Sequence, residues 1–428
     1  MDELEIGPAK GPLRGTVAIP GSKSVTNRAL LLAALAAGRS RIEGALKSDD
    51  TARMVEALQA MGASIEEPSA QSFVVEGRGS LLPPPAPLFL GNAGTATRFL
   101  AAAAANVDGT TIIDGDEDMR KRPIGPLADA LRDLGAAAKA PTGCPPLAVT
   151  GSGGIRGGRV EIDASLSGQF ASALLMAAAG ARGPLEVALA DASVGGRGYV
   201  DITLATMAAF GVGAERTGPS SWLVRPGPYL ARDFCVEPDA STATYFWAAG
   251  ALTGGELGVG AEPDSLSQPD AAAWRHIRSF PRMSGEIEGS QMQDAVPTLA
   301  VMAAFGKLPV RFTGIANLRV KECDRISALS EGLCRIAPGL AEEDGNDLVV
   351  RPQPGLAGSR AEASIRTYRD HRIAMAFALA GLLVGGIRIQ DPHCVAKTFP
   401  GFWEAMRSLG VRVSLFSPNL LQHDMRRE

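Results

Sequence analysis

Residues 20–38, PGSKSVTNRALLLAALAAG, contain the pattern on which the fold of this chain depends. Every residue from Ala29 to Ala37 is apolar, so a helix formed here has no polar face and must be buried. Its first turns nevertheless carry two cations, Lys23 and Arg28, among hydroxyl and amide side chains. A helix N-terminus is a natural anion site, and cations near it are unfavourable on their own. The stretch therefore predicts a buried helix that begins at an anion site. Simple helix capping, the alternative, explains Ser and Thr but explains the cations poorly.

The same pattern of a polar start and an Ala- and Leu-rich run recurs along the chain. Five further copies begin at Asn92, Ser167, Asp239, Asp294 and Arg369. Each begins with a cap-type residue and ends in Gly or Asn-x-x-Gly, which are typical start and stop signals of a helix. A second helix with one polar face, and then a short strand, follows in most copies. The fourth copy keeps the spacing but little else.

These repeats predict a two-domain α/β protein. A chain of 428 residues is too long for one hydrophobic core, and six modules of about 70 residues divide naturally into two sets of three. The boundary falls just before Asp239. We expect an N-terminal domain over 20–238 and a C-terminal domain formed by 239–428 together with 1–19.

Composition excludes several classes of protein. The net charge of -4 gives no general attraction to nucleic acid or to an anionic membrane, so an anion site must be a local cluster. The five cysteines include no Cys-x-x-Cys pair, which argues against a disulfide framework and against a zinc site. The start resembles no targeting signal, and the apolar runs are too short to span a bilayer. We expect a soluble cytoplasmic protein without a metal.

Two further segments combine strand ends, glycine and cations. In LFLGNAGTATRF, residues 88–99, a strand is expected to lead to Gly94 and then to a buried helix, so that backbone N–H groups can approach a ligand. In RVKECDRISAL, residues 319–329, Lys321 and Arg325 are expected to share a face of a first helical turn that follows a strand. Glu322 lies between them and could be tuned for proton transfer. An ordinary strand-to-helix turn and a solvated ion pair are the respective alternatives.

A third segment, residues 367–382, places Arg369, Asp370, His371 and Arg372 before another buried helix. Lys397 follows in a sequence, AKTFPG, that we expect to form a loop. A histidine beside an aspartate usually has a structural role. The two flanking arginines at the start of a buried helix are more unusual, because a helix N-terminus disfavours cations.

Seven segments of this chain, in order, resemble the 5-enolpyruvylshikimate-3-phosphate (EPSP) synthases. They are GSKSVTNRALLLAALAAG, LGNAGTATR, KRPIGPL, YVDITLATM, NLRVKECDR, DHRIAMAFALAG and AKTFPGF. The resemblance covers nearly the whole chain and implies a two-domain inverse α/β fold. That fold has six βαβαββ units, three per domain, and the N-termini of its buried helices face the cleft between the domains. The resemblance also implies that the strand at 11–19 closes the C-terminal domain.

The resemblance further implies an activity and its residues. The enolpyruvyl group of phosphoenolpyruvate would be transferred to the 5-hydroxyl of shikimate 3-phosphate, with release of phosphate and without a metal or an organic cofactor. Phosphoenolpyruvate would be bound by Lys23, Asn92, Gly94, Arg122, Gln169, Arg325, Arg372 and Lys397. Shikimate 3-phosphate would be bound by Lys23, Ser24, Arg28, Ser167, Gln169, Tyr199, Asp294, Asn317 and Lys321. Among the catalytic residues, Lys23 included, Glu322 would exchange the proton at the methylene carbon, while Asp294 and Lys321 would handle the hydroxyl proton.

The chain departs from the family pattern at three positions. Gly168 and Gly196 replace serines that could donate hydrogen bonds to the phosphate of shikimate 3-phosphate. Phe99 stands where many relatives have proline, beside the Gly94 loop, which leaves the response to glyphosate-type inhibitors open.

Three alternatives to this activity come from different functional classes. An enolpyruvyl transferase acting on UDP-N-acetylglucosamine would be expected to carry a cysteine before its Arg-Pro segment, and DGDEDMRKRPIG has none. An RNA-end phosphate cyclase would need a catalytic histidine and a basic groove, whereas the four histidines here are dispersed. A non-catalytic anion-binding scaffold would lack the acid, whereas Glu322 and Asp294 are both present. No strong dimerisation pattern is visible, so we expect a monomer.

Overall fold

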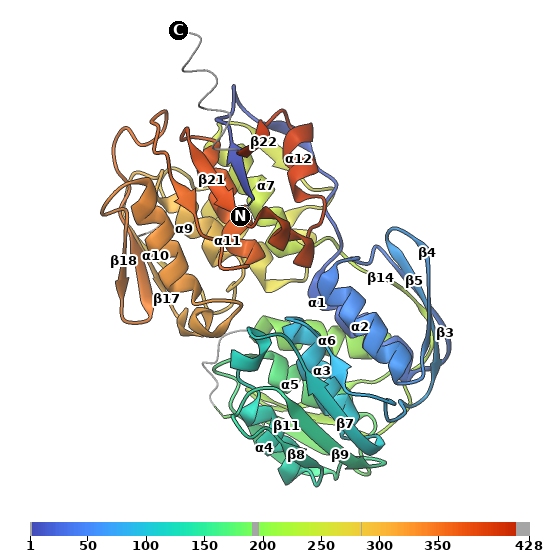
Figure 1. Ribbon diagram of the computed structural model, residues 1–428. Coiled ribbons are helices and arrows are strands. Elements are labelled where there is room, and N and C mark those ends of the chain that lie inside the picture. Colours follow the sequence, from blue (N-terminus) through green and yellow to red (C-terminus); the bar gives the residue numbers. More distant parts are fainter. Residues whose placement is uncertain (1, 191–196, 284, 417–428) are drawn as a thin grey trace. The chain divides into compact units, whose positions relative to one another are not determined.

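The computed structural model describes residues 2–190, 197–283 and 285–416 (Figure 1). The chain divides into two compact units, each with its own hydrophobic core. Unit 1 consists of Met1–Ile19, Ala240–Leu266 and Asp270–Glu428, and unit 2 consists of Pro20–Asp239 and Ser267–Pro269. The chain therefore passes from one unit to the other four times.

Three buried helices form the centre of unit 2. They are α1 (Lys23–Leu35), α3 (Gly94–Ala104) and α5 (Gln169–Ala178). Helix α1 lies inside residues 20–38, as predicted. Helices α3 and α5 each begin two residues after the predicted starts, Asn92 and Ser167. Every residue of α1 from Val25 to Ala34 is buried, as the absence of a polar face predicts. The second helices of the modules are α2 (Asp49–Ala60), α4 (Gly125–Asp133) and α6 (Arg197–Ala209). Figure 1 shows α1 beside α2, and the two helices pack against each other.

Three four-stranded sheets surround these helices, and each has two parallel strands followed by two antiparallel ones. Their orders are β14-β3-β5-β4, β6-β7-β9-β8 and β10-β11-β13-β12. The strands are β3 (Ala37–Glu43), β4 (Ser64–Ser69), β5 (Ser72–Arg78), β6 (Leu88–Phe89), β7 (Asp108–Asp114), β8 (Ala137–Lys139), β9 (Leu147–Ser152), β10 (Gly158–Ile162), β11 (Leu185–Leu189), β12 (Ala214–Gly218), β13 (Ser221–Val224) and β14 (Asp233–Cys235). The first sheet takes its outer strand, β14, from the end of the unit. The two later modules read βαβαββ along the chain, and a short 3-10 helix, η1 (Met119–Lys121), precedes α4.

Unit 1 repeats this plan with helices α7 (Ala240–Leu252), α9 (Val296–Ala303) and α11 (His371–Gly381) in its core. The remaining helices are α8 (Trp274–Ile277), α10 (Arg325–Ile336), α12 (Phe402–Ser408) and the 3-10 helices η2 (Pro263–Ser265), η3 (Pro269–Ala273), η4 (Ala316–Val320) and η5 (Pro392–Lys397). Helix α9 packs against α10 and α11 (Figure 1). The fourth module is reduced, as its sequence predicts, because its second helix is the four-residue α8.

Two four-stranded sheets and one two-stranded sheet belong to the described part of unit 1. Their orders are β16-β17-β19-β18, β20-β21-β1-β22 and β15-β2. The strands are β1 (Glu3–Ile6), β2 (Arg14–Thr16), β15 (Glu256–Gly258), β16 (Glu286–Glu288), β17 (Val310–Thr313), β18 (Ala341–Asp344), β19 (Asp347–Val350), β20 (Ser364–Ile365), β21 (Ile387–Gln390) and β22 (Val413–Phe416). This arrangement is the inverse α/β architecture, with helices in the core and sheets around them.

The N-terminal strands differ from the prediction. The strand inside 11–19 is β2, which pairs in parallel with β15 and opens the fourth module rather than closing a sheet. The closing strand is β1, which lies antiparallel between β21 and β22. Leu4 and Ile6 alternate with Glu3 and Glu5, and the two apolar residues are buried. Two apolar residues in an acidic segment are a weak signal, which is why the sequence pattern did not reveal this strand.

Within the described ranges, no helix combines the length and the hydropathy needed to cross a membrane.

Candidate active site

The first turn of α3 gathers two arginines around a glycine in unit 2. Arg122 donates to Asn92 Oδ1 at 2.9 Å, and Arg98 donates to the carbonyl of Gly94 and to Gln169 Oε1, both at 3.1 Å. A Cβ atom on Gly94 would lie 2.7 Å from Arg98 and 2.8 Å from Arg122, too close for any real contact. Glycine therefore lets the two guanidinium groups approach the backbone, and a side chain here would displace them. We call Asn92, Gly94, Arg98, Arg122 and Gln169 the Gly94 cluster.

Arg98 is a member of this cluster that the sequence interpretation missed. It is 5% exposed and lies four residues after Gly94, as Arg28 lies four residues after Ser24. The signal that singled out Arg28, a cation in the first turns of an all-apolar helix, could have found Arg98 as well.

Lys23 lies at the start of α1 and forms an ion pair with Asp50, with 3.2 Å between Nζ and Oδ2. The backbone N–H of Lys23 donates to Asp239 at 3.2 Å, so a carboxylate caps this helix end. Asp50 belongs to the first turn of α2, and nothing in its local sequence indicated this partner. Ser24 follows Lys23 directly, and its hydroxyl lies 3.3 Å from that of Ser22.

The start of α5 carries the predicted phosphate contacts. Ser167 is 8% exposed, and its hydroxyl accepts a hydrogen bond from the backbone of Gln169 at 3.3 Å. Gly168 is the N-cap residue of α5 and offers no hydroxyl. Gln169 also donates to Thr95 at 3.1 Å, which links the starts of α5 and α3. Gly196, the other position where serine is replaced, lies outside the described residues.

Arg28 is the most deeply buried cation of unit 2, at 1% exposure. Its Nε donates to Thr203 at 2.7 Å, and its two terminal nitrogens donate to the carbonyl of Ser24 at 2.9 Å, the hydroxyl of Ser172 at 3.2 Å and the carbonyl of Tyr199 at 3.1 Å. All of these acceptors are neutral. Burial therefore lowers the pKa of Arg28 to about 9, although an electrostatic interaction with Tyr199 acts in the opposite direction.

Unit 1 holds a different arrangement at the starts of α9, α10 and α11. Arg325 donates to Asp294 at 2.9 Å, to Glu322 at 2.8 Å and to Asp370 at 2.7 Å. Arg372 donates to the other oxygen of Asp294 at 2.7 Å, and Lys397 lies 3.2 Å from Glu322. We call Asp294, Glu322, Asp370, Arg325, Arg372 and Lys397 the carboxylate network. Its three carboxylates balance its three cations.

The carboxylates of this network stabilise the charged form of its buried arginine. Arg325 is 1% exposed and Asp370 is fully buried. Burial alone would lower the pKa of Arg325, but the carboxylates of Asp370, Glu322 and Asp294 raise it well above its usual value. Tyr245 interacts with Arg372, and burial raises the pKa of Tyr245 to about 12, so its hydroxyl stays neutral beside the network. Asp370 and Tyr245 are further residues that the sequence interpretation did not assign to the site.

Two local predictions about this region were wrong. Lys321 does not share a helix face with Arg325, because α10 begins only at Arg325, where Asp324 caps it by accepting from Ser327 at 3.1 Å. The preceding segment is the 3-10 helix η4 rather than a strand, and Lys321 donates instead to Gln293 at 3.0 Å. Lys397 ends the 3-10 helix η5 and does not lie in an irregular loop.

Asn317 is a buried residue of η4 with an unused polar atom. Its side chain is 6% exposed, and no described residue donates a hydrogen bond to its amide oxygen. Because a buried acceptor without a partner is costly, a donor from a ligand would be favourable here.

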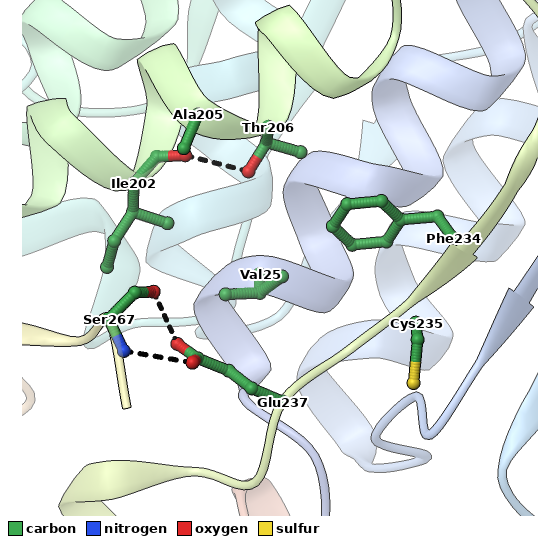
Figure 2. A pocket seen from close by; sticks show the side chains of 8 residues that line it. All are labelled: Val25, Ile202, Ala205, Thr206, Phe234, Cys235, Glu237 and Ser267. Carbon is green, nitrogen blue, oxygen red and sulfur yellow. Dashed lines mark hydrogen bonds between the residues drawn. The ribbon is translucent and has the colours of Figure 1, made fainter. Parts of the chain in front are cut away.

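A separate pocket of unit 2 does not suit an anion (Figure 2). Its lining residues are Val25, Ile202, Ala205, Thr206, Phe234, Cys235, Glu237 and Ser267. Glu237 reaches Ser267, accepting from its backbone at 2.9 Å and from its hydroxyl at 2.7 Å. This lining contains a carboxylate and no lysine or arginine, so the cations described above define the candidate site. Within the described ranges, no group of His, Cys, Asp and Glu side chains is placed to bind a metal ion.

Comparison with known proteins identifies the family. Residues 8–406 match the family model of EPSP synthase (3-phosphoshikimate 1-carboxyvinyltransferase). The chain is 60% identical to 3-phosphoshikimate 1-carboxyvinyltransferases of Rhizobium leguminosarum and Pseudomonas savastanoi, with 96% of this chain and 97% and 98% of theirs covered.

Solved structures agree with this match. The EPSP synthase of Acinetobacter baumannii superposes with a TM-score of 0.78 at 25% identity, covering 97% of this chain and all of the other. An enolpyruvyl transferase of Streptomyces tendae shares the fold, with a TM-score of 0.71 at 17% identity and the same coverage. The chain therefore belongs to the EPSP synthase family.

Proposed function

We propose that this protein transfers the enolpyruvyl group of phosphoenolpyruvate to the 5-hydroxyl of shikimate 3-phosphate and releases phosphate. It is a transferase of the shikimate pathway, which supplies chorismate and the aromatic amino acids. Beyond family membership, the observation that carries the proposal is the pair of carboxylates held by Arg325, Glu322 with a buried side chain and Asp294 with a partly exposed one. An anion-binding scaffold needs cations, but it does not need two carboxylates placed among them.

The two substrates are strongly anionic, and the site offers cations to both. Phosphoenolpyruvate would be bound by Lys23 and the Gly94 cluster in unit 2, and by Arg325, Arg372 and Lys397 in unit 1. The carboxylate of shikimate 3-phosphate would be bound by Ser24 and Arg28, with Ser167 at its phosphate and Tyr199 against its ring. A site of this kind, from which water is excluded, can hold two anions together and stabilise charge in transit.

The proposed chemistry is an addition followed by an elimination. Protonated Glu322 gives its proton to the methylene carbon of phosphoenolpyruvate, and the 5-hydroxyl oxygen attacks the adjacent carbon. Asp294, assisted by Lys321, takes the hydroxyl proton. Glu322 then removes a proton from the new methyl group, the carbon–carbon double bond re-forms, and the bond to the phosphate oxygen breaks. A single carboxyl group that acts first as acid and then as base fits the position of Glu322 between Arg325 and Lys397.

Asn317 supports the placement of shikimate 3-phosphate in this scheme. Its buried amide oxygen can accept a hydrogen bond from a hydroxyl group of the substrate. Together with Asp294 and Lys321, it would hold the hydroxyls close to the reacting carboxylates. We also infer that the protein acts as a cytoplasmic monomer, because its sequence shows no strong dimerisation pattern and its scattered free cysteines fit a reducing compartment.

Phosphate release from phosphoenolpyruvate tests the proposal. Purified protein is assayed in the presence of a metal chelator, with shikimate 3-phosphate or UDP-N-acetylglucosamine as acceptor. We expect phosphate only with shikimate 3-phosphate. Release only with UDP-N-acetylglucosamine would identify the other transferase activity, and no release with either acceptor would contradict the proposed reaction.

A further inference from the structure

The guanidinium of Arg28 has one partner that is not a hydrogen-bond acceptor. The ring of Phe99 lies against it, with 4.9 Å between the guanidinium carbon and the ring centroid. Phe99 belongs to α3 and is fully buried. Arg28 therefore lies where four helices of unit 2 meet, because its other partners are on α1, α5 and α6.

Hydrogen bonds and the ring act on different parts of this group. The five N–H donors of a guanidinium lie in its plane, and four of them are directed at Ser24, Ser172, Tyr199 and Thr203. The face of the guanidinium has no donor and cannot be satisfied in this way. The negative face of an aromatic ring attracts a cation there, most strongly where water is excluded.

A ring stabilises the charge without neutralising it. A carboxylate in the place of Phe99 would form an ion pair with Arg28 and compete with the carboxylate of a substrate. The neutral acceptors of Arg28, together with the cost of burying its charge, show that this cation is retained without an acidic partner among the described residues. Phe99 is suited to such a site because it supplies attraction and leaves the charge available.

We propose that Phe99 is a positioning residue for shikimate 3-phosphate, acting through Arg28. The inference rests on the proposed function. The ring holds the charged guanidinium against α3 while one terminal nitrogen donates to the carbonyl of Ser24, in the geometry that binds the substrate carboxylate. Loss of the ring weakens binding of this substrate and leaves the chemical step, whose acid and base belong to unit 1, nearly unchanged.

The test compares Phe99→Leu with Phe210→Leu. Both phenylalanines are fully buried in unit 2, but Phe210 packs against the ring of Phe234, with centroids 5.6 Å apart, and no cation of the described residues lies over its ring. The dissociation constant of shikimate 3-phosphate is measured by titration calorimetry without phosphoenolpyruvate, and kcat is measured at saturation. We expect Phe99→Leu to raise the dissociation constant about tenfold. We expect little change in kcat, and little change in either quantity for Phe210→Leu.

A double-mutant cycle separates the proposed role from general packing. In an Arg28→Gln background, Phe99→Leu should change the affinity by less than about twofold, because the cation that the ring supports is absent. In the single variant, the alkaline loss of affinity should begin at a lower pH, because the charged form of Arg28 has lost a stabilising contact. Phe99→Met has a similar volume to Phe99→Leu but a more flexible side chain, and it provides the same comparison if Phe99→Leu folds poorly.

Two results would overturn the inference. One is an equal loss of affinity in Phe99→Leu and Phe210→Leu. The other is a loss in the Arg28→Gln background as large as in the wild-type background. Failure of the proposed function would appear differently, because the unmodified protein would then neither bind shikimate 3-phosphate nor release phosphate.

Discussion

Arg28 and Arg325 are buried to the same extent, at 1% exposure, but their surroundings are opposite. Arg325 is held by three carboxylates, which raise its pKa despite burial. The described partners of Arg28 are neutral groups and an aromatic ring, and burial lowers its pKa to about 9. The charge of Arg325 is neutralised by carboxylates of the protein itself. Arg28 keeps its charge at a cost to the free energy of folding, as expected for a group that binds an anionic ligand.

Substitution of Arg325 should have the largest effect on the stability of the protein. Arg325→Gln leaves Asp370 and Glu322 buried without their main cation, so we expect unit 1 to lose about 3–5 kcal/mol of stability. Urea unfolding followed by tryptophan fluorescence measures this loss, because Trp247, Trp274 and Trp403 belong to unit 1.

The control for this variant is on the same helix. Arg335 forms an exposed ion pair with Glu331 at 2.7 Å near the end of α10, and its side chain is 48% exposed. Arg335→Gln should cost less than about 1 kcal/mol. Equal losses in the two variants would mean that the carboxylate network contributes no more to stability than a surface pair.

At Arg28 the expected effect is on ligand affinity and on its pH dependence. Arg28→Gln should weaken shikimate 3-phosphate about 100-fold at pH 8, because a buried charged contact to the substrate carboxylate is lost. The pKa of Arg28 is lower in the folded protein, so the cost of its burial is fully present below about pH 9 and is relieved as the pH rises toward the unfolded value. Binding needs the charged form, and the advantage of the wild type over Arg28→Gln should therefore fall about tenfold between pH 8 and pH 10.

Calorimetric titrations of both proteins from pH 8 to pH 10 measure this advantage. A constant ratio of affinities across that range would show that Arg28 does not lose its charge there. No difference between the two proteins at pH 8 would remove Arg28 from the substrate site.

Much of the fold could be predicted because its signals are local. An all-apolar run with a capped start defines a buried helix without reference to any other part of the chain, and all six such helices are present. The same local signal, cations in a first turn, pointed to Lys23, Arg28, Arg325 and Arg372. What it could not indicate is which distant residue each cation would meet.

The features that were missed depend on tertiary contacts or on weak patterns. Asp50, Thr203 and Ser172 act on cations that lie far from them in sequence, and their own segments read as ordinary helices. The sequence signal for strand β1 consists of two apolar residues, Leu4 and Ile6. The segment Ser267–Pro269 groups with unit 2 because Glu237 accepts hydrogen bonds from Ser267 and Gln268, which no local pattern predicts.

The central claim is that unit 2 supplies binding charge through Arg28 while unit 1 supplies the acid and base through Glu322. Glu322→Gln tests it most directly, with kcat and the dissociation constant of shikimate 3-phosphate measured on the same preparation. We predict that kcat falls about a thousandfold while the dissociation constant changes less than about twofold, because the amide keeps the shape but cannot exchange the proton. Retained turnover, or affinity lost in step with turnover, would contradict this division of roles.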